Sequence, residues 1–180
     1  MIDEAIRIGK KLAFYKLIDG ASGNLSFKTN GEIVITKTGV MLDELNDEAF
    51  VKVKMGDKNE IASSDLIVHQ KIYEKTKYRA VLHCHGVYNV VLSLNMEEIV
   101  PVDLEGRMFI NKLEVVDGAF GSESLAEKIA EIVAKNGIVI VRGHGMYVAE
   151  KNLTEAFKKA AYAEHSCEIL FRLRQISFST

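Results

Sequence analysis

The 180-residue chain lacks the features that mark secreted and membrane proteins. Its two cysteines, Cys84 and Cys167, are too few for a disulfide framework and form no C-x-x-C pair, which favours a reduced, intracellular setting. No apolar run approaches the roughly 20 residues that span a bilayer. The beginning, MIDEAIRIGKK, carries early acidic residues and is not typical of a signal peptide. We therefore expect a cytoplasmic protein.

An excess of charge of one sign is also missing. The chain has 23 Lys and Arg against 25 Asp and Glu, so its formal net charge is -2. This balance gives no broad basic field for nucleic acid and no polybasic signal for a membrane surface. Pro101 is the only proline, and no repeat or Pro/Ser-rich linker divides the sequence. The length suits one core, so residues 1–180 are predicted to form a single domain.

Apolar periodicity and turn residues predict an alternation of helices and strands. Helices are expected over 2–17, 63–75, 88–94, 122–135 and 152–174, and strands over 25–29, 32–36, 79–85, 108–117, 137–143 and 145–150. Asn30-Gly31 between the first two strands is typical of a two-residue hairpin. Ser63 or Ser64 is expected to cap the second helix, with Asp65 in its first turn. Hairpins with separate covering helices predict an α/β fold with a mixed or largely antiparallel sheet.

An H-x-H pair gives the first indication of a functional site. His83 and His85 lie at the end of the strand expected over 79–85, and residues two apart on a strand point to the same face. By chance alone, the pattern could be one exposed histidine at a strand end. However, buried apolar residues run into Gly86 here, so the pair is expected at an edge of the sheet where sites are built.

A third histidine follows the apolar strand at 137–143. His144 stands in a G-H-G sequence, in which the glycines let the backbone approach a ligand closely. Taken alone, this sequence is better explained as a tight hairpin turn with an incidental histidine. Together with His83 and His85, it completes the three-ligand set of a catalytic zinc site with an open fourth position. The same ligands also admit cobalt or manganese.

Three loops rich in small polar residues accompany the histidines. They are S-G-N at 22–24, T-K-T-G at 36–39 and S-S-D at 63–65, the last at a helix start whose free N–H groups favour anions such as phosphate. Each is also an ordinary turn or cap, but together they suggest a pocket with a metal at one end and a phosphate at the other. His69 and His165 lack a partner at metal spacing and are interpreted as structural or surface residues.

The ordered motifs S-G-N-L-S, T-K-T-G, S-S-D, H-C-H-G and G-H-G across 22–145 resemble the class II aldolase/adducin family, and within it the fuculose-1-phosphate aldolases. The resemblance covers nearly the whole chain. It implies a three-layer α/β/α domain around a mostly antiparallel sheet, and a homotetramer with interfacial active sites. It also implies a zinc-dependent aldolase, with one Zn2+ per subunit, that reversibly cleaves a ketose 1-phosphate to dihydroxyacetone phosphate and an aldehyde such as L-lactaldehyde.

The same resemblance assigns roles to residues. His83, His85 and His144 correspond to the zinc ligands. The positions that correspond to the phosphate site are Gly23, Asn24, Thr38, Gly39, Ser63 and Ser64. Asp65 stands where the family usually has a glutamate that acts as general acid/base and can also ligate zinc before substrate binds. Aspartate shortens that arm by one methylene, roughly 1.5 Å.

A second departure concerns the aldehyde. The fuculose-phosphate aldolases use a tyrosine of a neighbouring subunit to protonate the leaving aldehyde, and this chain has Glu105 near that place, so no residue is assigned to the role. This departure concerns the aldehyde partner more than the aldol chemistry itself. Two alternatives stay open on other grounds. The same scaffold hosts sugar-phosphate 4-epimerases and a methylthioribulose-phosphate dehydratase. Adducin-type relatives are non-catalytic interaction proteins that lack the zinc ligands, and the complete histidine set here speaks against that reading.

Overall fold

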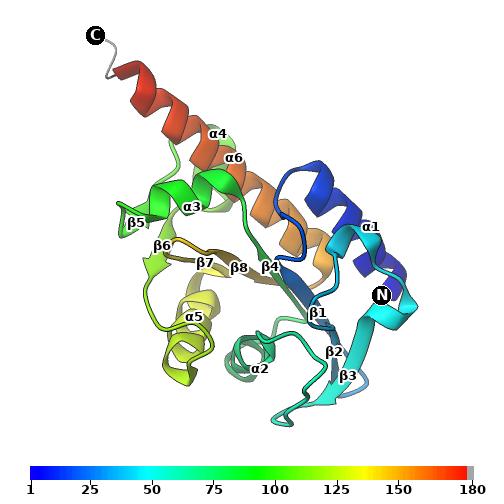
Figure 1. Ribbon diagram of the computed structural model, residues 1–180. Helices are drawn as coiled ribbons and strands as arrows, with labels where there is room; N and C mark the ends of the chain where they lie inside the picture. Colours follow the sequence, from blue (N-terminus) through cyan, green and yellow to red (C-terminus); the bar gives the residue numbers. More distant parts are fainter. Residues whose placement is uncertain (178–180) are drawn as a thin grey trace.

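A computed structural model describes residues 1–177 of the chain and arranges them in three layers, with a sheet between two layers of helices (Figure 1). The helices are α1 (Ile2–Phe14), α2 (Leu66–Lys75), α3 (Val87–Ser93), α4 (Leu104–Phe109), α5 (Glu123–Asn136) and α6 (Leu153–Ser177). The strands are β1 (Asn24–Thr29), β2 (Glu32–Thr36), β3 (Phe50–Lys54), β4 (Ala80–Cys84), β5 (Glu98–Ile99), β6 (Leu113–Val116), β7 (Ile138–Val141) and β8 (Gly145–Glu150).

The strands form one sheet in the order β3-β2-β1-β4-β8-β7-β6-β5. Among these described strands only β6 and β7 run parallel; the other neighbouring pairs are antiparallel. The predicted hairpin joins β1 to β2, and Asn30 and Gly31 have positive φ angles of 48° and 81°, as the tight turn requires. The expected α/β/α fold with a mostly antiparallel sheet is confirmed.

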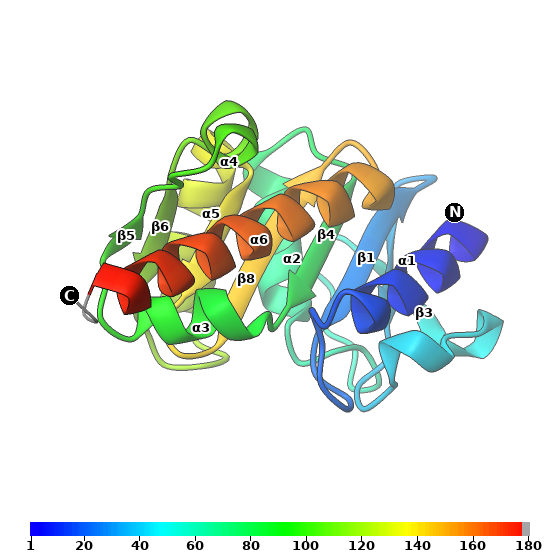
Figure 2. The same ribbon diagram turned by 90° about the horizontal axis from the view of Figure 1, so that it is seen from above.

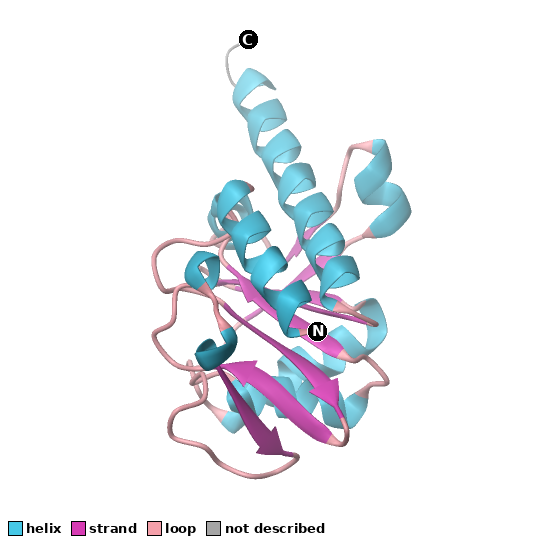
Figure 3. Ribbon diagram, turned by 90° about the vertical axis from the view of Figure 1, so that its right-hand side faces the viewer, coloured by secondary structure: helices cyan, strands magenta, loops and turns pink. Residues whose placement is uncertain are grey.

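Helices cover both faces of the sheet. Figures 1 and 2 show α1, α3 and α6 on one face of the sheet and α2 and α5 on the other, and Figure 3 shows the strands between helices on both sides. Helix α4 packs against α6. The central strand β4 is therefore buried on both sides: Leu82 and Cys84 enter one apolar core and Val81 the other. This explains the continuous apolar run before His83, which sits at 1% exposure on a strand with no solvent-facing side. Its ring nitrogens must find partners within the protein.

Two sequence-based boundaries need correction. The first helix ends at Phe14, before Lys16 adopts a positive φ of 57°. The strand expected over 108–117 is limited to β6, because residues 108 and 109 complete α4 and Asn111 makes a turn with φ of 64°. Short-range patterns did not separate α4 from the strand that follows it. None of the helices within residues 1–177 is both long and apolar enough to cross a membrane.

Candidate active site

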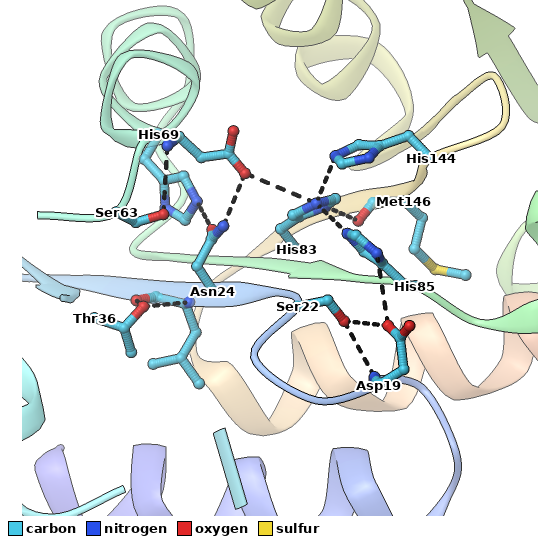
Figure 4. A network of polar contacts seen from close by, with 12 residues as sticks. Asp19, Ser22, Asn24, Thr36, Ser63, His69, His83, His85, His144 and Met146 are labelled. Carbon is cyan, nitrogen blue, oxygen red and sulfur yellow. Dashed lines mark hydrogen bonds and ion pairs between the residues drawn. The ribbon is translucent and has the colours of Figure 1, made fainter. Parts of the chain in front are cut away.

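The pairing of β4 with β8 gathers the three predicted histidines. Cys84 lies opposite Met146 in this antiparallel pair, so the end of β4 adjoins the turn that leads into β8. The Nε2 atom of His83 lies 2.8 Å from that of His85 and 3.0 Å from that of His144 (Figure 4). One nitrogen from each ring lies within 4.8 Å of the others. The two segments, about 60 residues apart in sequence, thus form one cluster.

The geometry of this cluster fits a divalent metal ion. Zn–N bonds of about 2.0–2.1 Å in a tetrahedral site separate ligand nitrogens by about 3.4 Å, near the spacing seen here. His83 Nδ1 lies 3.0 Å from the carbonyl oxygen of Met146. Donation of the Nδ1 proton to that carbonyl leaves the Nε2 lone pair directed at the other two histidines, as is usual for a metal ligand.

Burial keeps the three imidazoles in the form that binds metal. It lowers the pKa of His83 to about 3, and it also lowers the pKa of His85 and of His144 below their ordinary values. Because only the neutral imidazole is a ligand, protons compete weakly with a metal at neutral pH. The cluster is therefore ready to accept a cation without a proton first being removed.

The glycines around His144 have a steric reason. A Cβ atom at Gly145 would lie 2.4 Å from the carbonyl oxygen of Cys84 and 2.9 Å from the ring of His85. Gly143 has a positive φ of 66°. Arg142, which the sequence analysis did not single out, binds this turn to the rest of the protein: its side chain donates to the Ser93 carbonyl and to Asp117. The G-H-G turn is thus fixed beside β4.

Asp65 is directed into the site rather than along its helix. It occupies the N-cap position of α2, but its side chain makes no capping hydrogen bond, and the expectation that Ser63 or Ser64 caps this helix is wrong. The Oδ2 atom of Asp65 lies 2.8 Å from Asn24 Nδ2 and 3.7 Å from His83 Nε2. Burial favours the neutral acid, but the attraction of a charged His83 and the hydrogen bonds from the Asn24 amide and the Tyr147 hydroxyl outweigh burial and lower the pKa of Asp65.

A cavity of about 170 Å³ opens onto the histidines. Every site residue predicted from the sequence lines it: Gly23, Asn24, Thr38, Gly39, Ser63, Ser64, Asp65, His83, His85 and His144. Phe120, which the sequence analysis passed over, adds an apolar wall, and its ring centroid lies 5.4 Å from that of His144. A neighbouring hollow of about 590 Å³ shares residues 38, 63 and 64 with this cavity. The structure thus brings the predicted metal and phosphate ends together.

Two other histidines have different positions. His165 is exposed on α6, which agrees with its interpretation as a structural or surface residue. His69 is fully buried, and its Nε2 lies 2.6 Å from Asn24 Oδ1, so it connects to the site through one intervening side chain. The sequence did indicate that His69 lies on the site's side of α2, because Asp65 and His69 stand four residues apart and so share one side of the helix.

The fold and site define an α/β/α protein with a cluster of three histidines, arranged so that they could hold a metal ion, and a buried carboxylate in a small polar pocket. Comparison with known sequences identifies its class more closely. The sequence profile of the Class II Aldolase and Adducin N-terminal domain matches residues 3–171, and the chain belongs to this family.

Several relatives carry more specific names. The chain is 30% identical over 169 residues to an L-fuculose phosphate aldolase of Methanocaldococcus jannaschii, covering 91% of this chain and 92% of the relative. The crystal structure of L-fuculose-1-phosphate aldolase from Thermus thermophilus has a TM-score of 0.95 at 29% identity and covers 99% of this chain and 96% of its own. A probable bifunctional methylthioribose-1-phosphate isomerase/methylthioribulose-1-phosphate dehydratase of Nocardia farcinica is 25% identical, over 85% of this chain and 32% of its own.

The three-histidine cluster predicts how metal affinity responds to substitution. His144→Ala removes one converging nitrogen and should weaken the binding of a divalent metal by more than the roughly 10- to 100-fold that loss of an outer-shell partner costs. Dialysis against metal buffers, followed by elemental analysis, measures this. His165→Ala, which changes an exposed histidine on α6, is the control and should retain the parent affinity. Parent affinity in His144→Ala would show that the cluster is not the metal site.

Proposed function

We propose that the chain is a zinc-dependent aldolase that reversibly cleaves a ketose 1-phosphate of the L-fuculose 1-phosphate type to dihydroxyacetone phosphate and an aldehyde such as L-lactaldehyde. The observation that carries this proposal is the position of Asp65, whose carboxylate oxygen lies 3.7 Å from His83 Nε2 in the cavity that the histidines line. The aldolase names of relatives that match over more than nine tenths of the chain support it.

The protein residues divide the chemistry between them. A zinc ion held by His83, His85 and His144 would supply Lewis-acid stabilisation of the negative charge that develops on the substrate oxygens when the C–C bond breaks. Among residues 1–177, Asp65 is the only carboxylate that lines this cavity, and the lowered pKa keeps it ionised as a base. In the synthetic direction the carboxylate removes a proton from the hydroxymethyl carbon of dihydroxyacetone phosphate. In the cleavage direction the hydroxyl group of the leaving half gives up a proton as it becomes the aldehyde, and Asp65 takes up a proton and delivers it to the carbon left by the broken C–C bond.

The phosphate end lies at the start of α2. Ser64 is exposed there and Ser63 is buried, and both line the cavity together with Thr38 and Gly39. The positive end of the dipole of the ten-residue helix favours an anion at this place. Phosphate bound among these groups would hold the reacting carbons between Asp65 and the histidines, which raises the rate through orientation.

A sugar-phosphate 4-epimerase or dehydratase on the same scaffold is the alternative. The relative of Nocardia farcinica, with its probable dehydratase activity, motivates it. So does Glu105, which stands near the place of the tyrosine that serves the leaving aldehyde in the fuculose-phosphate aldolases. The products distinguish the reactions, because only the aldolase releases a free triose phosphate and an aldehyde.

We further infer that the chain assembles into homotetramers, as the resemblance to its family implies. Large apolar side chains exposed on α3 and α4 support an interface there. They are Val87, Val91, Leu104, Met108 and Phe109. Sedimentation equilibrium should give the mass of four chains of 20.1 kDa each, and a mass of one chain at micromolar concentration would contradict the inference.

The proposed base predicts a specific loss in the Asp65→Asn variant. Asparagine keeps the shape of the side chain but cannot take a proton. Solvent deuterium exchange into dihydroxyacetone phosphate, measured without aldehyde on the zinc-loaded protein, should slow by roughly 100- to 10,000-fold. If Asp65 had only a structural role at the start of α2, asparagine would serve about equally well and the rate would stay near that of the parent. Exchange at the parent rate would therefore exclude Asp65 as the base.

The phosphate site predicts a substrate-dependent effect of Ser64→Ala. The side chain of Ser64 is exposed at the start of α2, so its replacement should leave the fold intact. Its loss should remove a hydrogen bond to a charged group, worth roughly 1.5–3 kcal/mol, and raise KM for phosphorylated ketoses about 10- to 100-fold. Steady-state kinetics with a phosphorylated and an unphosphorylated ketose measure the difference. Equal losses on both substrates would argue against a phosphate contact.

A further inference from the structure

A buried chain of hydrogen bonds leads from Asp65 away from the cavity. Asn24 Nδ2 lies 2.8 Å from Asp65 Oδ2, and Asn24 Oδ1 lies 2.6 Å from His69 Nε2. On the other side of the ring, His69 Nδ1 lies 2.6 Å from Ser26 Oγ, which in turn lies 2.8 Å from the Tyr73 hydroxyl. None of the five side chains exceeds 6% exposure, so water is no substitute partner for them.

The donors and acceptors of these five side chains allow only one direction of hydrogen-bond donation. Asn24 donates through Nδ2 to the Asp65 carboxylate and presents Oδ1, which only accepts, to His69. His69 therefore carries its proton on Nε2 and accepts at Nδ1 from the hydroxyl of Ser26, which is free to accept from Tyr73. Burial lowers the pKa of His69 to about 4, which leaves a single ring proton at neutral pH, as this arrangement requires.

The five hydrogen-bonded residues come from only two elements, a helix and a strand that face each other. Asp65, His69 and Tyr73 recur every four residues along one side of α2, and Asn24 and Ser26 stand two apart on one face of β1. The helix and the strand thus supply alternate residues along this row of hydrogen bonds. A movement of α2 relative to β1 would break several of these bonds at once.

The orientation of the Asn24 amide depends on His69. If the amide were flipped, its oxygen would face the Asp65 carboxylate and its NH2 group would face the N–H of His69, two repulsive contacts in place of two hydrogen bonds. An unpaired buried polar group costs more than a hydrogen bond contributes on average, so a neutral Nε2–H ring excludes the flipped state. His69 does not line the cavity, and its influence on the site passes through Asn24.

We propose that His69 is a positioning residue: it fixes the Asn24 amide, and Asn24 holds the Asp65 carboxylate in place beside the three histidines. The amide of Asn24 thereby serves Asp65 rather than the substrate phosphate, which reassigns one residue of the expected phosphate site. This inference rests on the proposed function for its kinetic consequences, while the hydrogen bonds themselves can be measured without any turnover.

The first test is nuclear magnetic resonance of the 15N-labelled, full-length protein at neutral pH. The His69 ring should be the Nε2–H tautomer, with a ring proton that exchanges slowly with solvent in the parent and rapidly in Asn24→Ala. An Nδ1–H tautomer, or a ring proton equally protected in both proteins, would overturn the proposal. The outcome does not depend on activity, so it stands apart from any failure of the proposed aldolase reaction.

The second test is kinetic and uses His69→Gln on zinc-loaded protein. Deuterium exchange should slow by about 10- to 100-fold, the usual cost of losing a partner behind the reacting groups. The factor should be the same for dihydroxyacetone phosphate and dihydroxyacetone, with little change in KM. Thr76→Ala, which removes a hydroxyl bonded to the Ile72 carbonyl at the far end of α2, is the control and should exchange at the parent rate.

Double variants separate positioning from a general loss of structure. His69→Gln should add little to the loss caused by Asn24→Ala, because both act on Asp65 through one connection, whereas its effect should multiply with that of Ser64→Ala. Losses that multiply in both pairs, or that appear only with the phosphorylated substrate, would overturn the proposal. Ser26→Ala is the milder variant if His69→Gln does not fold, and it should slow exchange by about 2- to 10-fold; an unchanged rate would count against the proposal.

Discussion

The antiparallel pairing of β4 with β8 is the contact on which the candidate site depends. It sets Cys84 opposite Met146, so that the H-x-H end of one strand meets the G-H-G turn before the other. Both strands are buried on both faces, and their position in the sheet is therefore fixed by packing as well as by the ladder of hydrogen bonds. A shift of the register by one residue would turn His83 to the opposite face and separate the three nitrogens.

Buried polar groups in this site are stabilised by partners from different elements. His83 is stacked on Tyr147, with ring centroids 4.0 Å apart, and bonds to the Met146 carbonyl. Asp65 receives the Asn24 amide. Each of these contacts joins α2, β1, β4 or β8 to another of the four, so the groups that would bind metal and transfer protons also connect the layers. These contacts restrict where the groups of the site can lie, which suits a reaction that depends on orientation.

Local sequence patterns were sufficient for the parts of the site that lie within one element. The H-x-H and G-H-G spacings predicted the histidine cluster, and Asn30-Gly31 predicted the hairpin that leads away from Asn24. Contacts between distant elements have no such local signature. Glu164 on α6 accepts hydrogen bonds from the backbone N–H of residues 88 and 89 and so fixes the helix start that follows the histidine pair, across 75 residues of sequence. The contact of Glu164 with the start of α3 becomes apparent only from the packing of α6 on α3.

The aspartate at position 65 can be understood from the same packing. A glutamate has one more rotatable bond, so its carboxylate can adjust to a metal or substrate, whereas an aspartate reaches only as far as the backbone places it. The α2 helix therefore has to begin close to the histidines, and it does, since Asp65 is its N-cap residue with Oδ2 3.7 Å from His83 Nε2. With fewer side-chain states to restrict, the amide of Asn24 and the hydroxyl of Tyr147 hold the carboxylate in place. The short side chain of Asp65 and the buried hydrogen bonds behind it thus act together to position the proposed base.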